Sequence, residues 1–404
     1  MTSDTRPSPE PRDIAIVGGG PVGLALACQL LRTTSWRVTL IDAATPARAA
    51  RDPRAIALSH GSRQLLEQIG AWPVPGSPIE HIHVSQRNHF GHVKLHHDEY
   101  GVPALGYVVR YGDLCAVLER ALAQAAQAAP GQLERAFETR IDTTMQAGDL
   151  VHLGGSMHAG QESQPFALDA HIAVQAEGGL FHEQAGHTGR GAQRRDYGQT
   201  AIIGHLTASQ PKPGWAWERF TEEGPLALLP YDAHDTPGYA LVWCCAPEQA
   251  TRRLAMPEDD FALELGQMIG NRLGRLTLEG KRHAYALGLN AAPVTVDGRV
   301  VAVGNAAQTL HPVAGQGLNL GLRDAFALAD SLRADCSPQA LEAFAARHRV
   351  DRAVTIGVTD MLPRVFGLAN PLAGHARGVG LAAMACFAPL KDALARHMMY
   401  GMRR

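Results

Sequence analysis

The segment Asp13-Ile14-Ala15-Ile16-Val17-Gly18-Gly19-Gly20-Pro21-Val22-Gly23 decides the fold of this chain. Its apolar start predicts a buried strand, its glycines a tight turn, and the residues after them a helix to about Arg32. A second apolar run, 38–41, ends in Asp42, 22 residues after Gly20. In a βαβ unit with this spacing, the glycines let the backbone approach a pyrophosphate, and the acid binds ribose hydroxyls. The sequence therefore predicts a dinucleotide-binding α/β fold, for NAD or FAD, with the nucleotide at Gly18, Gly20, Gly23 and Asp42.

A second glycine-rich stretch lies late in the chain, at 299–321. Residues 300–303 form an apolar run that predicts a strand buried on both faces of a parallel sheet. Pro312, Gly315 and Gly317 then predict a loop, and a periodic apolar segment predicts a helix from Leu318. The start of such a helix points unpaired N–H groups and the positive end of its dipole at the loop. This loop is therefore a candidate site for an electron-rich ligand.

Length and composition limit the classes to which the protein can belong. With 404 residues, the chain is long enough for two domains of ~100 to 200 residues each. A net charge of -2 leaves no basic footprint for binding nucleic acid. The six cysteines and 19 histidines show no spacing typical of a zinc site or a disulfide framework. We therefore expect no metal, no nucleic-acid partner and a reducing, cytoplasmic environment.

Neither end of the chain has the pattern of a membrane-spanning segment. Residues 1–12 carry Pro7, Pro9 and Pro11 among polar residues, which predicts a disordered lead-in and not a signal peptide or an anchor. The uncharged stretch 378–390 has 13 residues, whereas a spanning helix needs ~18 to 20. We expect a protein that is soluble or peripheral to a membrane.

The late glycine-rich stretch also resembles a known motif. In flavin-dependent aromatic monooxygenases, a strand ends in Gly-Asp, followed by Ala-Ala-His, a Pro, and a Gly-x-Gly-x-Asn loop that wraps the flavin. Here Asn305 replaces the usual Asp and Gln308 the usual His, which resembles the ubiquinone-biosynthesis hydroxylases of the 2-polyprenyl-6-methoxyphenol hydroxylase type. The resemblance implies that FAD is bound by Asn305, Pro312, Gly315, Gln316, Gly317, Leu318 and Asn319.

Three further segments resemble the same family. Residues 52–58 match its Asp-x-Arg-Ala-x-Ala-Leu segment, which implies that Arg54 lies close to the flavin or the pyrophosphate. The alternative is a solvated arginine at the entry to a helix. Arg110 matches an arginine that reaches the ribityl or phosphate region. Glu177 and Gly178 stand in a motif whose family form is Ala-Asp-Gly-x-x-Ser, with Glu in place of Asp and Phe181 in place of Ser. These departures put the nicotinamide step in more doubt than FAD binding.

Residues 216–230 and 241–244 resemble the substrate-domain sheet of that family. Strand alternation alone indicates a half-buried sheet, so Phe220 and Leu228 either line a pocket or belong to a plain core. The resemblance implies that Phe220, Leu228 and Pro230 contact the substrate. Elsewhere, 79–97 predicts a β-hairpin, 257–272 a helix and 283–289 a strand.

The predicted architecture is a Rossmann-like FAD-binding domain interleaved with a β-sheet substrate domain and followed by C-terminal helices. The first comprises residues 13–78, 103–195 and 291–335, the second 79–102 and 196–290, and the third 336–404. In the last part, 381–404, apolar residues stand beside cations. A helix lying on an anionic bilayer and a helix docked over the core both fit this pattern.

The resemblance implies an FAD-dependent monooxygenase that hydroxylates the ring of a polyprenylphenol in ubiquinone biosynthesis, using O2 and NADH or NADPH. A lipid-like substrate implies contact with the inner face of the membrane through the C-terminal helix, and the pathway implies a multi-enzyme complex. No residue stands out as a general base, so no catalytic residue is predicted. Two alternatives stay open: an FAD monooxygenase of a soluble aromatic compound, and a non-catalytic flavoprotein-fold partner in the same pathway.

Overall fold

A computed structural model describes residues 10–159, 162–178, 193–232, 236–291, 295–309, 315–366 and 387–401. Residues 1–9 of the predicted lead-in lie outside this part of the chain. One sheet has the order β17-β18-β11-β1-β2-β8, with β10 paired to β11 and β9 paired to β10. Its strands are β1 (Arg12–Val17), β2 (Val38–Ile41), β8 (Leu133–Ala136), β9 (Thr139–Ala147), β10 (Leu150–Ala159), β11 (Glu162–Gln175), β17 (Val296–Asp297) and β18 (Val300–Ala302).

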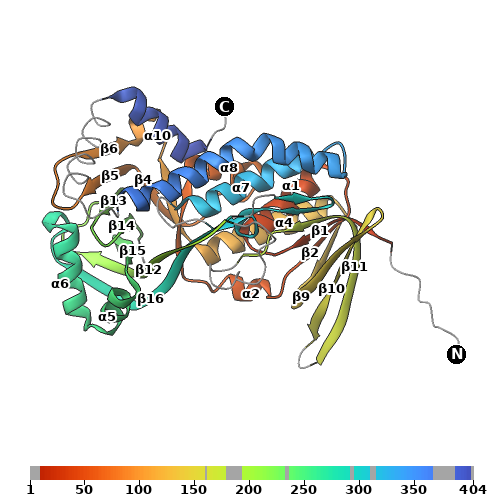
Figure 1. The fold of residues 1–404 in the computed structure, drawn as a ribbon, viewed down its shortest axis with the longest axis horizontal. Helices are drawn as coiled ribbons and strands as arrows, with labels where there is room; N and C mark the ends of the chain where they lie inside the picture. Colours follow the sequence, from red (N-terminus) through yellow and green to blue (C-terminus); the bar gives the residue numbers. More distant parts are fainter. Residues whose placement is uncertain are drawn as a thin grey trace.

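Strand β1 lies in the middle of this sheet, parallel to both neighbours. Ile14 stands opposite Val38 of β2 on one side and Ile172 of β11 on the other. Residues 14–17 are buried, as an apolar strand covered on both faces requires. β18 lies parallel to β11, with Val301 buried but Val300 and Ala302 partly exposed, so the late strand is less enclosed than predicted. The α/β, Rossmann-like fold predicted from the first βα unit is confirmed (Figure 1).

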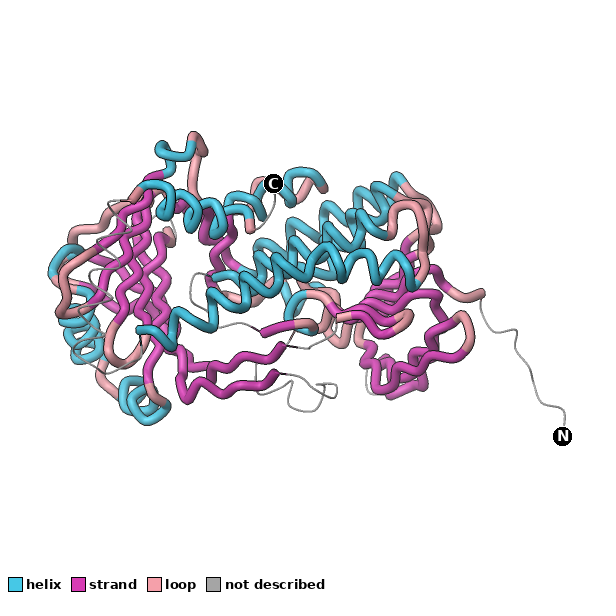
Figure 2. The backbone as a smooth tube through the Cα atoms, turned by 45° about the horizontal axis from the view of Figure 1, so that its top comes forward, coloured by secondary structure: helices cyan, strands magenta, loops and turns pink. Residues whose placement is uncertain are grey.

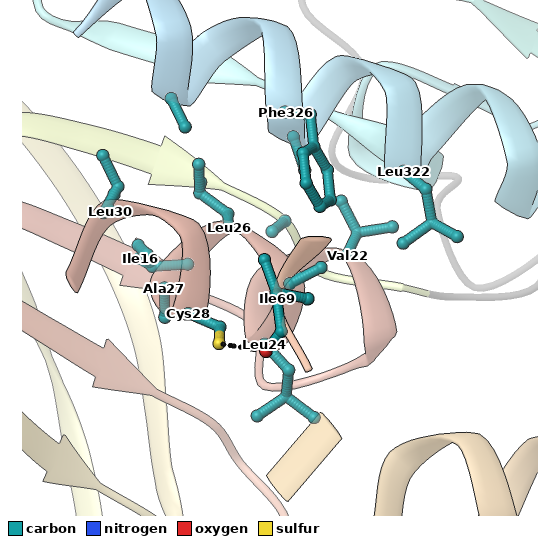
Figure 3. Close-up of a cluster of buried hydrophobic side chains, with 14 of the residues drawn as sticks. Ile16, Val22, Leu24, Leu26, Ala27, Cys28, Leu30, Ile69, Leu322 and Phe326 are labelled. Atoms are coloured by element: carbon teal, nitrogen blue, oxygen red, sulfur yellow. Dashed lines mark hydrogen bonds between the residues drawn. The ribbon is translucent and has the colours of Figure 1, made fainter. Parts of the chain in front are cut away.

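Helices cover this sheet and share one apolar core. Figure 3 shows Val22 and Leu26 of one helix beside Leu322 and Phe326 of another, with the Cys28 thiol directed at the carbonyl of Ile69. This packing brings the late glycine-rich stretch next to the first βα unit. The helices that share this core are α1 (Pro21–Thr33), α3 (His60–Gln68), α4 (Tyr111–Ala128), α7 (Gln316–Ser331) and α8 (Pro338–Phe366). The short helix α2 (Pro46–Ala49) has no buried residue.

A small antiparallel sheet, in the order β3-β7-β4, connects the two halves of the molecule. It consists of β3 (Ala55–Ser59), β4 (Gly76–Ile79) and β7 (Gly106–Arg110). Ala57 and Val108 of this sheet pack against Ala216 of the second large sheet. The predicted arginines therefore stand close to the boundary between the two halves.

The second large sheet has the order β19-β16-β12-β15-β14-β13-β5-β6. Its long strands β12 and β16 reach from the sheet toward the centre of the molecule (Figures 1 and 2). The predicted hairpin is present as β5 and β6, and β5 joins the sheet by pairing with β13. The strands are β5 (His81–Gln86), β6 (His92–His96), β12 (Gln193–Ala208), β13 (Trp215–Phe220), β14 (Pro225–Pro230), β15 (Gly238–Cys245), β16 (Leu276–Ala291) and β19 (Gln308–Thr309).

The two faces of this sheet have different neighbours. One face packs Trp217, Leu228 and Trp243 against α5 (Pro247–Ala255) and α6 (Glu258–Ile269). The other face, which we call the inner face, packs Ala216 and Leu229 toward the small sheet. Helix α6 is shorter than the predicted helix 257–272, because Gly270 has a positive φ of 88° and the short 3-10 helix η3 (Asn271–Leu273) follows it. The other 3-10 helices are η1 (His97–Tyr100) and η4 (Gly304–Ala306).

The C-terminal helix α10 (Ala388–Tyr400) docks on the hairpin β5–β6 (Figure 1). Its Ala395 and Met399 are buried against Val93 and Leu95 of β6. This contact favours the docking alternative for that half of the helix. Near its start, Phe387 and Leu390 are 60% and 48% exposed, so an apolar end also faces solvent. Residues 381–386 and 402–404 of the predicted segment lie outside the described residues.

Candidate FAD site

The turn between β1 and α1 fits the pyrophosphate of a dinucleotide. Gly20 is the N-cap of α1, with an extended backbone that any residue adopts. A Cβ added there would meet only the Tyr111 hydroxyl oxygen, at 3.3 Å. The backbone at Gly20 is therefore open to a ligand, at the helix end that favours phosphate.

Gly18 and Gly23 have another role. A Cβ on Gly23 would lie 1.9 Å from the carbonyl oxygen of Gly18, and a Cβ on Gly18 would lie 2.5 Å from the backbone of Ala176. Gly18 also has a positive φ of 116°. Both glycines are thus required by the packing of the turn itself, and Gly20 is the one whose missing side chain leaves room for a ligand.

Asp42 lies at the end of β2, next to the same turn. Its Oδ2 accepts a hydrogen bond from the Gly19 N–H at 2.5 Å, and its Oδ1 accepts one from the Ala44 N–H at 2.6 Å. These bonds fix the carboxylate beside the glycine turn. This is the position that a ribose-binding acid occupies after the second strand of a βαβ unit.

Two predicted arginines stand near the start of α4, each held by a carboxylate. Arg54 donates from Nη2 to Asp52 Oδ2 at 2.7 Å, and its guanidinium lies 5.0 Å from the centre of the Tyr111 ring. Arg110 donates to Asp113 Oδ1 at 2.7 Å. Both arginine side chains are 38% exposed, so a ligand can reach them while the ion pairs restrict their orientation. The Asp52 pair and the Tyr111 ring hold Arg54 in place, which favours a defined role over a freely solvated arginine.

Helix α7 begins at Gln316, two residues earlier than predicted, because Gly315 caps it in a left-handed conformation with φ of 60°. Asn319 fixes this helix start. Its side-chain N–H groups donate to the carbonyls of Ala57 at 3.0 Å and Gly315 at 2.7 Å, and its Oδ1 accepts from the Ser59 N–H at 2.8 Å. The Asn319 side chain thus positions the loop, and the cofactor contact predicted for it stays a prediction.

The remaining predicted cofactor residues are distributed around this helix start. Asn305 belongs to η4, and its Oδ1 lies 3.9 Å from the position of a Cβ on Gly317. Leu318 is partly buried against the apolar core that α1 and α7 share. Glu177 and Gly178 are exposed at the end of β11, and a Cβ on Gly178 would meet nothing within 4 Å. Pro312 and Phe181 lie outside the described residues.

The substrate residues predicted from the second sheet divide between its two faces. Leu228 is fully buried in the cluster under α5 and α6, so its assignment to the substrate pocket is wrong and the plain-core alternative holds. Pro230 follows it at strand spacing on the same face, which corrects that assignment too. Phe220 lies three residues after Trp217 on β13, so its side chain points to the opposite, inner face, where it is 3% exposed.

An apolar cavity of about 60 Å³ lies at the inner face, beside the start of α7. Gln316 and Asn319 line one side of it, and Ala395, Met398 and Met399 of α10 line another. The remaining lining includes Ile79, Ile82, Leu95 and Leu105. The cavity thus connects the predicted flavin loop to the C-terminal helix through apolar side chains.

Two residues of this region were missed by sequence reasoning. Tyr111 contributes its hydroxyl beside Gly20, and burial raises its pKa, so that the hydroxyl stays protonated. The sequence feature that could have identified Tyr111 is its place directly after Arg110, at the start of a helix. Glu218 stands on the inner face, and the feature that could have identified it is its position next to Trp217 in an alternating strand. Within the described residues, no group of three or more His, Cys, Asp or Glu side chains could hold a metal ion.

An open glycine turn at a helix N-terminus and an acid at the end of the next strand define a dinucleotide-binding site, and the comparisons with known proteins identify it as that of an FAD-dependent hydroxylase. The family model for the FAD binding domain matches residues 12–355. The chain belongs to this family, and its resemblance to ubiquinone-biosynthesis FAD hydroxylases is confirmed by its relatives.

Two relatives and one solved structure illustrate the likeness. A ubiquinone hydroxylase of Rhodospirillum rubrum is 33% identical, with 96% of this chain and 89% of the relative covered. The 3-demethoxyubiquinol 3-hydroxylase of Escherichia coli K12 is 28% identical, with 93% and 95% covered. The p-nitrophenol 4-monooxygenase of Pseudomonas putida superposes with a TM-score of 0.72 over 98% of this chain and 99% of that one. At 15% identity, this last comparison shows a shared fold.

Asn305 gives a test of the late loop. We expect Asn305→Asp to change FAD affinity by the ~0.5 to 1.5 kcal/mol of one hydrogen bond, because an amide both donates and accepts whereas a carboxylate only accepts. Fluorescence titration of apoprotein with FAD measures this change. Unfolding of the two apoproteins is the control for an effect on the helix start. Equal affinity and equal flavin potential in both proteins would place Asn305 away from the cofactor.

Proposed function

We propose that this protein hydroxylates the aromatic ring of a polyprenylphenol intermediate of ubiquinone biosynthesis, with O2 and NADH or NADPH. The observation that carries the substrate class is the apolar lining of the small cavity between α7 and α10, because a lipid-like substrate needs apolar side chains next to the flavin loop. Two relatives, at 33% and 28% identity, carry names that include a ubiquinone or demethoxyubiquinol hydroxylase, which supports the same pathway.

FAD supplies the oxygen-transfer chemistry, and the chain supplies orientation, charge and exclusion of water. We propose that the backbone at Gly20 contacts the pyrophosphate and that Asp42 binds the ribose. We propose that the start of α7, with Gly315 and Gly317, would stabilise negative charge on a bound flavin ring through its N–H groups and its positive dipole end. Arg54 and Arg110, held by their carboxylates, add positive charge at the boundary between the two halves.

We propose that the nicotinamide docks near Arg54 and Glu177, since the family has no separate nicotinamide domain. Glu177 keeps the family's negative charge but is longer by one methylene. A misplacement on the order of 1 Å costs ~100-fold in rate. Glu177 is exposed at the end of β11, where the longer side chain has room to adjust. We therefore expect normal flavin reduction.

Anaerobic mixing with NADH or NADPH, with and without a polyprenylphenol, tests this expectation. We expect the visible flavin absorbance to bleach, and the variant Glu177→Asp to react within a few-fold of the natural protein. A ~100-fold gain in that variant would show that the natural carboxylate is misplaced. A flavin that stays oxidised in every mixture contradicts the monooxygenase proposal and supports the non-catalytic alternative.

Admitting O2 to the reduced protein then identifies the substrate class. We expect a ring-hydroxylated product from a prenylated phenol, and much less product from the same phenol without its prenyl chain. Equal product from both phenols would favour the soluble-aromatic alternative, since the apolar cavity would then contribute nothing to binding.

The membrane contact is proposed for the exposed start of α10. Phe387 and Leu390 are exposed there, and Lys391 is paired with Glu99 on η1. No helix in the described ranges is long and apolar enough to cross a bilayer. An apolar end beside a cation suits binding at the inner, cytoplasmic face of a membrane and docking into a biosynthetic complex. We retain the division into FAD-binding domain, substrate domain and C-terminal helices as part of this proposal.

A further inference from the structure

Glu218 is an acid on an otherwise apolar sheet surface. It lies on β13, opposite Val84 of β5 on one side and Ala227 of β14 on the other. Along its own strand, Ala216 and Phe220 share its face, since successive side chains point to opposite faces. Glu218 is partly buried, and its carboxylate lies among these apolar neighbours on the inner face.

The face of the sheet that carries Glu218 is the one directed at the candidate FAD site. Trp217 packs under α6 on the outer face, so Glu218 stands on the inner face. Ala216, two residues earlier, packs with Ala57 of β3. A Cβ on Gly315, at the start of α7, would lie 3.1 Å from the Ala57 Cβ. The inner face therefore continues from the flavin loop to Glu218.

The apolar cavity reaches the same part of the inner face. Ile82 of β5 lines the cavity. It pairs with Ala216 of β13, and Glu218 lies two residues further along β13. Ile82 and Val84 also pack near Ala395 and Met399 of α10. The apolar side chains around the cavity therefore continue along the inner face as far as Val84, the partner of Glu218 on β5.

We propose, on the basis of the proposed function, that Glu218 is the catalytic base that accepts the proton of the substrate's phenol hydroxyl. The phenol O–H bond breaks, its electron pair stays on the phenol oxygen, and the proton forms an O–H bond with the carboxylate. The phenolate is more electron-rich at its ring carbons, which favours attack on an electrophilic oxygen. The proton returns to water when the product leaves.

The protonation of Glu218 suits this role. Burial raises its pKa to about 7, so that it both accepts and releases a proton near neutral pH. The flanking strands place only Val84, Ile82, Ala227, Leu229, Pro225 and Gln86 near it on this face. Cys244 on β15 interacts with it, and burial raises the pKa of that thiol. On α10, His397 interacts with Arg323 and Asp351 instead.

Binding of a phenol and of its methyl ether across the pKa of Glu218 tests the proposal. The probes are a prenylated methoxyphenol and its fully methylated analogue, titrated into the FAD-loaded protein. We expect the phenol to bind tighter as pH rises through about 7, because the ionised carboxylate accepts a charge-assisted hydrogen bond from the hydroxyl. The ether has no hydroxyl proton, so its affinity should stay constant, and Glu218→Gln should bind both probes without pH dependence.

Turnover separates a base from a merely structural residue. We expect Glu218→Gln to slow hydroxylation ~100-fold, the lower end for general-base catalysis, and Glu218→Asp to recover part of the loss. A prenylated nitrophenol that is already ionised at the assay pH needs no base, so Glu218→Gln should hydroxylate it within a few-fold of the rate of the natural protein. Equal losses with ionised and neutral phenols would overturn the proposal, as would unchanged pH dependence of phenol binding in Glu218→Gln.

The apoprotein gives a readout that is independent of turnover. The folded-state pKa of Glu218 is raised above its unfolded value, so its contribution to stability is present below the unfolded value and is lost as pH rises through about 7. We expect this loss in the natural apoprotein and its absence in Glu218→Gln. If the protein hydroxylates a prenylphenol but these tests fail, the proposed function stands and Glu218 is not its base.

Discussion

Gly20→Val is expected to yield folded, colourless protein. The structure leaves room for the new side chain apart from the Tyr111 hydroxyl, and the backbone at Gly20 is extended, so the substitution does not strain the chain. The bound pyrophosphate would meet the valine. Loss of two charge-assisted hydrogen bonds, at ~1.5 to 3 kcal/mol each, weakens FAD binding by on the order of 100-fold or more. The FAD content of the purified protein measures the effect.

Two other glycines serve as controls for Gly20→Val. Gly266→Val adds the same side chain on α6, where a Cβ would meet nothing within 4 Å, and should keep full FAD content. Gly23→Val would bring a Cβ to 1.9 Å from the Gly18 carbonyl and should prevent folding of the turn altogether. A Gly20→Val protein that retains full FAD occupancy would contradict the assignment of this turn to the pyrophosphate.

The first βα unit could be predicted from sequence because all its determinants are local. Gly18, Gly20, Gly23 and Asp42 lie within one short segment, and the spacing of strand, turn and acid leaves little freedom in three dimensions. The chain alone does not reveal that Gly18 and Gly23 are required by packing whereas the space beside Gly20 is open. That difference depends on which atoms approach each glycine, including Ala176, which is distant in sequence.

The substrate sheet was less predictable, because alternation gives two faces without saying which one faces the flavin. Trp217 and Leu228 share a face, and only the packing of α6 shows that this face is the core side. The assignment of Leu228 to the pocket failed for that reason. Glu218 was missed for the same reason, since a carboxylate on a strand is ordinarily solvated. The positioning role of Asn319 could not be predicted, because its partners at Ala57 and Ser59 are remote in sequence.

The buried ion pair of Arg323 connects the flavin loop to the C-terminal helices. Arg323 of α7 is 4% exposed and donates from Nε to Asp351 Oδ2 of α8 at 2.9 Å, and from Nη2 to the Thr355 hydroxyl at 3.3 Å. A Cβ on Gly401, directly after α10, would lie 2.6 Å from the guanidinium carbon. Helices α7 and α8 and the end of α10 therefore meet at this one side chain.

Arg323→Ala is expected to lower the free energy of unfolding by about 3 to 5 kcal/mol, because it leaves the Asp351 carboxylate buried without its counter-ion. Urea unfolding of the apoprotein measures the loss, and hydrogen exchange over 387–401 should show earlier opening of α10. The control is Arg333→Ala, whose ion pair with Asp330 is more than half exposed and contributes about 0 to 1 kcal/mol. The double variant Arg323→Met with Asp351→Leu should recover most of the stability, since it removes both charges together. Equal losses in Arg323→Ala and Arg333→Ala would show that burial gives the Arg323 pair no special weight, and α10 would then be held by its other contacts, which include the apolar packing on β6 and the Lys391–Glu99 ion pair.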